Sequence, residues 1–273
     1  MATNSISLSA SARANLLSLK DTTDALARTQ NRLATGKRVN TAIDGASAFF
    51  SSQGFLNRAN DFASVKENLG TALQTLNAVS NAIDAITAVV QQAQGITVSA
   101  LNTTDADERT AFASQFNALL TQINSLVADA TFNGVNLLSS GNLTVNFNES
   151  TAIELTVAAV NTYVGSGGLN IVAAATGWSG DAQINASVTD LSAALSTLRT
   201  TASGFGNNAT LIQTRQDFTD TLINTLQVAS DNLVLADENE EGANLQALQA
   251  RLQLGVVSLG ISGQQLQAIL RLF

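Results

Sequence analysis

The sequence predicts a mainly α-helical protein: a long antiparallel coiled-coil bundle built from both chain ends, with a small β-hairpin region in the middle. Three observations support this prediction. Apolar residues recur at heptad spacing over long stretches towards both ends of the 273-residue chain. Proline is absent, so no residue removes a backbone donor inside a helix. Between the helical stretches the apolar period falls to two, which is typical of strands.

The core helices follow from the longest heptad repeats. Residues 51–160 are expected to hold two core helices and the β-hairpin, and a heptad repeat from Phe62 to Val90 predicts the first of these helices. A second helix begins after Asp105, because Glu108 stands three residues later at capping-box spacing. Residues 181–236 predict the third, C-terminal core helix. The core of the coiled coil is expected to contain Phe62, Leu69, Leu76, Ile83, Val90, Leu191, Leu198, Ile212 and Leu226.

The middle of the chain shows two short runs with apolar residues at alternate positions, 143–147 and 153–157. These runs predict two strands joined by a short polar turn. Residues 161–180 have no sustained period, are rich in glycine and small polar residues, and hold the only Tyr and the only Trp. We interpret them as a surface connection.

The two chain ends, residues 1–35 and 237–273, carry apolar stripes without a charged outer face. Such helices cannot bury their apolar surface alone, so we expect them to pair with each other and then with neighbouring copies. Residues 36–50 are the expected connecting spoke. An ordinary helical hairpin inside a monomeric bundle is the alternative. The expected inner assembly contacts are Leu19, Leu26, Leu33, Leu245, Leu252, Leu259 and Leu266.

Composition excludes several function classes. The net charge of −8 disfavours a nucleic-acid partner, which needs clustered basic residues. With no His and no Cys, the chain lacks the residues of a serine–histidine triad, a cysteine nucleophile or an ordinary zinc site. We therefore expect no catalytic residues, no cofactor and no metal. The remaining candidates for carboxylate chemistry are Asp105 with Asp107, interpreted as a helix cap, and residues 237–241, interpreted as a solvated hinge.

The sequence contains no stretch of about 18 apolar residues that could span a membrane, and the N-terminus lacks the pattern of a cleaved signal peptide. We therefore expect neither membrane insertion nor a cleaved signal.

Three segments resemble one known family. Residues 33–44 read LATGKRVNTAID and resemble the stretch that follows the first terminal helix of bacterial flagellins. Residues 130–138 read ATFNGVNLL and resemble the Phe-Asn-Gly signature at the end of the second core helix. The run LQALQARLQLGVVSLGISGQQLQAILRLF is similar to the terminal helix of the short alphaproteobacterial flagellins. All three occur in the family's order.

The resemblance implies a structural subunit that polymerises into the helical flagellar filament for swimming motility. The alternative is a hook–filament junction protein, which shares the terminal helices. The resemblance also implies an extracellular location reached by flagellar type III export, with an export chaperone, a filament cap and junction proteins as partners. Some flagellins carry an Arg and a Glu that an animal receptor recognises; Gln94 and Gln115 stand at those positions here, so we expect weak recognition.

Overall fold

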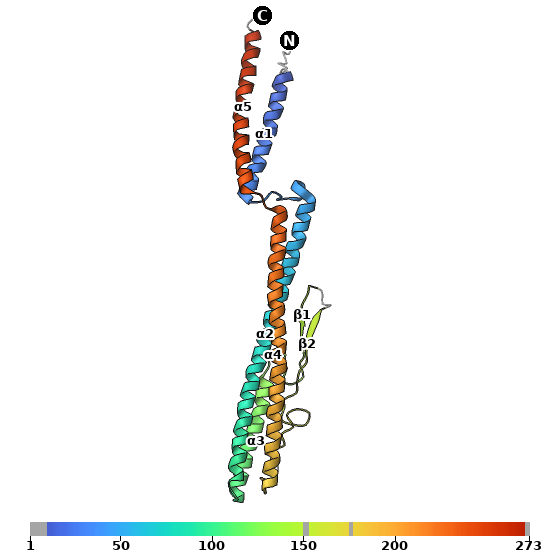
Figure 1. Cartoon of the computed structure of the whole chain (residues 1–273), viewed down its shortest axis with the longest axis vertical. Coiled ribbons are helices and arrows are strands. Elements are labelled where there is room, and N and C mark those ends of the chain that lie inside the picture. The colour runs from blue at the N-terminus through green and yellow to red at the C-terminus, as the bar shows by residue number, and fades with distance from the viewer. Residues whose placement is uncertain (1–9, 150–152, 175–176, 271–273) are drawn as a thin grey trace, which may run out of the picture. The chain divides into compact units, whose positions relative to one another are not determined.

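The computed structural model describes residues 10–149, 153–174 and 177–270, with only the backbone described for residues 266–270. The chain forms two compact units: unit 1 combines residues 1–57 with 225–273, and unit 2 is residues 58–224. The described elements are, in chain order, α1 (Ala10–Thr35), α2 (Ala42–Leu101), α3 (Ala106–Asp129), β1 (Leu143–Asn146), β2 (Glu154–Val157), α4 (Asp181–Val234) and α5 (Glu238–Leu270) (Figure 1). The predicted mainly α fold with one small hairpin is confirmed.

The core of unit 2 lies between α2, α3 and α4. Leu69, Ile86 and Val90 of α2 are fully buried, as are Phe116 of α3 and Leu198 of α4. Apolar residues at heptad spacing lie on one face of a helix, so the three helices bury a continuous seam. All nine residues expected in the coiled-coil core are buried, eight of them in unit 2 and Leu226 in unit 1.

α3 begins at the predicted cap. The Asp105 carboxylate accepts hydrogen bonds from the backbone N–H groups of Asp107 (2.9 Å) and Glu108 (3.0 Å). The reciprocal bond of a capping box is absent, because the Glu108 carboxylate accepts from the Thr103 hydroxyl instead. Asp105 thus satisfies donors that would otherwise lack partners at the helix start.

The two strands form an antiparallel hairpin in which Leu143 pairs with Val157 and Val145 with Leu155. Val145 and Val157 are buried against the core, whereas Thr144, Glu154 and Thr156 are exposed. The segment before the hairpin makes a tight turn at Asn133 and Gly134, both with positive φ (48° and 79°). Only residues that tolerate this region suit the turn, which accounts for the Asn-Gly sequence.

Residues 161–180 are expected to form a surface connection, and the described part of this segment nevertheless carries five buried side chains. Thr162, Val164, Leu169, Ile171 and Trp178 are all buried in unit 2. The segment lacks a period because it is irregular backbone, yet its apolar side chains pack into the core. It is therefore part of the folded unit.

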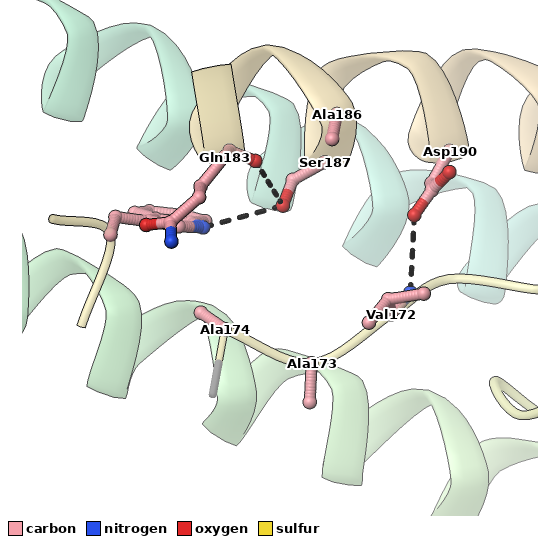
Figure 2. A pocket seen from close by; sticks show the side chains of 8 residues that line it. Val172, Ala173, Ala174, Gln183, Ala186, Ser187 and Asp190 are labelled. Atoms are coloured by element: carbon pink, nitrogen blue, oxygen red, sulfur yellow. Dashed lines mark hydrogen bonds between the residues drawn. The ribbon is translucent and has the colours of Figure 1, made fainter. Parts of the chain in front are cut away.

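Trp178 anchors this connection. Its ring packs on Phe116 with centroids 4.9 Å apart, and its indole N–H donates to Ser187 Oγ at 3.3 Å. Figure 2 shows Ser187 and Asp190 of α4 facing the connection, where the Asp190 carboxylate accepts from the backbone N–H of Val172. The residues around them line a cavity of about 400 Å³. A buried Trp with its N–H satisfied stabilises the segment that carries it.

Ion pairs tie the helices of unit 2 together. Lys66 of α2 contacts Asp220 of α4 at 2.5 Å. Arg109 of α3, which is 8% exposed, pairs with Asp181 at the start of α4 and also donates to the Thr103 carbonyl at 2.8 Å. None of the described helices has a stretch long and apolar enough to cross a lipid bilayer.

Candidate assembly surface

The two chain ends meet in unit 1, where α1 and α5 pack side by side (Figure 1). The stripe residues predicted as assembly contacts lie at this helix–helix contact and are half-buried. They are therefore used first within one chain, which pairs its own two ends. The residues concerned are Leu19, Leu26, Leu33, Leu245, Leu252 and Leu259; Leu266 lies in α5, but its side chain is outside the described residues.

A close approach of the two helices occurs at Gly255. A Cβ added to Gly255 would lie 2.7 Å from Leu19 Cδ1, so the Leu19 side chain would have to shift. Nearby, the Asn15 side-chain amide donates to Ser258 Oγ at 3.3 Å. Small residues on α5 thus allow α1 to approach closely, and the contact leaves a groove of about 450 Å³ between the helices.

The outward side of the pair is also apolar. These residues lie outside the predicted heptad stripe, so the sequence analysis missed them. A second apolar set on the same helix was the available signal, because a helix that is apolar on more than one side is normally surrounded. We call outward those residues of α1 and α5 that the pairing leaves at least half exposed, and Leu254 among them also borders the groove. They are Leu16, Leu17, Leu254, Val256, Val257 and Ile261.

An ion pair joins the last turn of α1 to the first turn of α5. Arg32 Nη1 of α1 donates to Glu241 Oε1 of α5 at 2.8 Å. Glu241 is 6% exposed, and its other oxygen, Oε2, has no hydrogen-bond partner in the described structure. The expectation of a solvated acidic hinge is therefore wrong at Glu241. Asp237 is also engaged, since its carboxylate accepts from the N–H groups of Asn239 and Glu240 and caps α5.

The link between α1 and α2 is bound to the link between α4 and α5. Arg38 N–H donates to the Val234 carbonyl at 2.7 Å, and Ala236 N–H donates to the Gly36 carbonyl at 3.0 Å. Gly36 has φ +67°, where glycine suffers no strain. These bonds fix the point at which both chain ends leave the core helices. The expected spoke, residues 36–50, divides here into this link and the first turns of α2.

The first turn of α2 is held by Asp44. Its Oδ2 accepts from the N–H groups of Asn40 (3.1 Å) and Thr41 (2.9 Å) and from the Thr41 hydroxyl (3.0 Å). These bonds, chiefly the one from the Thr41 backbone, hold the pKa of the Asp44 carboxyl below its usual value of 3.8. Asp44 therefore binds the turn most firmly when ionised.

The other singled-out residues take no part in this surface. Asp105 and Asp107 belong to the α3 cap, and within residues 10–149, 153–174 and 177–270 no group of three His, Cys, Asp or Glu side chains could hold a metal ion. Gln94 is half-buried in α2, and Gln115 is exposed on α3.

The family match and the curated relatives identify one family. Residues 6–143, about half of the chain, match the bacterial flagellin N-terminal helical region. A flagellin of Brucella melitensis is 31% identical over 98% of this chain and 99% of its own. Flagellin FljM of Caulobacter vibrioides is 30% identical over the whole of both chains. A crystal structure of Bacillus cereus flagellin covers 56% of this chain and 88% of its own, at 17% identity and TM-score 0.49. The chain therefore belongs to the flagellin family, the structural subunits of the bacterial flagellar filament.

Proposed function

We propose that this chain extends the flagellar filament by docking its α1–α5 pair among the same helices of neighbouring copies. The observation that carries the proposal is the outward apolar face of that pair. Leu254 is 70% exposed and Leu17 is 61% exposed, although both lie on well-formed helices. Apolar side chains kept in water on regular helices are typical of a surface that another molecule covers.

The magnitudes favour docking against several copies at once. Completing the burial of one half-exposed Leu, Val or Ile side chain contributes about 1–2 kcal/mol. Six such residues would contribute about 6–12 kcal/mol, whereas association costs about 4–15 kcal/mol in lost freedom of motion. A contact with one neighbour that covers part of this face is therefore marginal. A subunit that meets several neighbours at a filament end gains more, which favours elongation over dimer formation.

The half-buried stripe has a supporting role. We infer that Leu19, Leu26, Leu33, Leu245, Leu252, Leu259 and Leu266 hold α1 and α5 together, so that the pair presents its outward face in one orientation. The nine coiled-coil residues hold the core helices in the same way. An export chaperone, a filament cap and junction proteins are its proposed partners. We propose no catalytic role.

Electron microscopy and sedimentation of the purified chain on sheared filament seeds test this proposal. The wild-type chain should elongate the seeds. Val257→Asp should not, because it places a charge on the outward face, and its α1–α5 pair should persist because Val257 is 59% exposed. Leu252→Asp should lose both the helix pair and elongation.

The graded control is Val257→Ala, which removes apolar area without adding charge. It should elongate with a critical concentration between those of the wild type and Val257→Asp. Normal filaments from Val257→Asp would show that this face is not buried on assembly.

A further inference from the structure

Two large apolar side chains outside the helix pair are also left in water. Ile43, which precedes the break in helical geometry at Gly45, is 97% exposed, and Phe50, after the break, is 64% exposed. Both belong to residues 39–50, which we call the α2 start. No other large apolar side chain described as exposed approaches the value for Ile43. Single exposed apolar residues are ordinary, but a nearly bare isoleucine and an exposed phenylalanine within one short segment are not.

The α2 start holds these side chains firmly. Asp44 binds the N–H groups of the turn, and Asp44 N–H donates in turn to the Thr41 carbonyl at 3.1 Å. Val39 anchors the turn, because its side chain is only 3% exposed and its N–H donates to the Val234 carbonyl. Ile43 therefore protrudes from a turn whose backbone is hydrogen-bonded. Because the backbone of this turn is already ordered, little backbone entropy is lost when a partner covers Ile43.

Phe50 is held in a similar manner. Its ring makes an edge-to-face contact with Phe49, with the centroids 5.5 Å apart and the planes at 77°. Phe49 is half-buried and lines a small cavity near Val234. The pairing orients Phe50 while leaving most of its surface exposed.

The character of unit 1 points to a second copy of this chain as the occupant. Ten of the 16 large apolar side chains described as exposed lie in unit 1, although unit 2 is the longer unit. Unit 1 also holds eight basic and eight acidic residues. Lys37 and Arg38 beside the α2 start are exposed, and so are Asp237, Glu238 and Glu240 at the start of α5. One copy thus offers another both apolar surface and opposite charge.

We propose that the α2 start, through Ile43 and Phe50, docks against a second copy of this chain at a contact separate from the α1–α5 pair. This inference rests on the proposed function, because it requires that the chain polymerises. It adds a second contact between neighbouring subunits, made by the α2 start.

The test measures the critical concentration for elongation of full-length variants on sheared wild-type seeds. Ile43→Ser and Phe50→Ser should each raise the soluble concentration left at equilibrium by at least about tenfold, because each removes most of the transfer free energy of one large apolar side chain. The matched control is Ile43→Val, which keeps a branched apolar side chain and should change the critical concentration by less than about threefold.

Folding does not confound the result. Ile43 is 97% exposed in the single chain, so Ile43→Ser should leave the circular dichroism spectrum and thermal melting of the monomer unchanged. Unchanged critical concentrations for both serine variants would overturn the inference, even if a different protein bound the α2 start. Failure of the wild-type chain to elongate seeds would instead refute the proposed function, and the two failures are therefore distinguishable.

Discussion

Replacing Arg32 with methionine tests how the two chain ends are joined. Arg32→Met keeps a long apolar stem but removes the charge that faces Glu241. The Glu241 side chain is 8% exposed and loses its only described partner, while its Oε2 already has none. Removing one member of a buried ion pair costs about 3–5 kcal/mol. Because the Arg32 side chain is 35% exposed, solvent screens part of this ion pair. We therefore expect the free energy of unfolding of unit 1 to fall by about 1–3 kcal/mol.

Amide hydrogen exchange in α1 and α5 measures this loss directly. A loss of 1.4 kcal/mol corresponds to tenfold faster exchange, so we expect exchange roughly tenfold to a hundredfold faster in both helices. Trp178, the only tryptophan, lies in unit 2 and supplies an internal control, since its fluorescence melting curve should not move.

The double variant Arg32→Met, Glu241→Met is the second control. It replaces both charges by apolar side chains, so it should recover most of the lost protection. Exchange in α1 and α5 that changes less than about threefold in Arg32→Met would refute the reasoning that this pair joins the chain ends.

Three further predictions concern the core and the α2 start. Gly204→Ala should raise the free energy of unfolding by up to about 1 kcal/mol in urea denaturation, because the glycine lies within α4 and an added Cβ meets no atom within 4 Å. Trp178→Ala should lower it by about 3–5 kcal/mol, measured by circular dichroism, since the ring is 2% exposed and packs on Phe116. The turn held by Asp44 should be fully protected from amide exchange above pH 3.8 and lose this protection as the pH falls through the lowered pKa of Asp44. Asp44→Asn should remove this pH dependence. Exchange of the Thr41 amide measures both.

Much of the fold could be predicted because the signals are local. The heptad spacing of Leu69, Leu76 and Ile83 marks one helix face without reference to any other part of the chain. The spacing of Asp105 and Glu108 predicts a cap, and the Asp105 carboxylate accepts from the N–H groups two and three residues ahead. The alternation around Val145 predicted the hairpin for the same reason.

The surface of the terminal helices could be predicted only in part. Their apolar stripes indicated that each helix needs a partner, but periodicity does not say whether that partner is the same chain or a neighbour. The structure pairs α1 with α5 along Leu19 and Gly255, which leaves Leu254 and Val257 outward. The outward residues could therefore be identified only once the pairing of α1 with α5 was known.

The sequence by itself determined the helices, the hairpin, the absence of His and Cys chemistry, and the resemblance to flagellins. Only the tertiary structure decided that Trp178 is buried in a segment without a period, and that Glu241 meets Arg32 across 209 positions of sequence. Local patterns record which residues avoid water, because that preference belongs to each side chain and its near neighbours. They do not record which surface covers them, because that choice depends on contacts between distant segments.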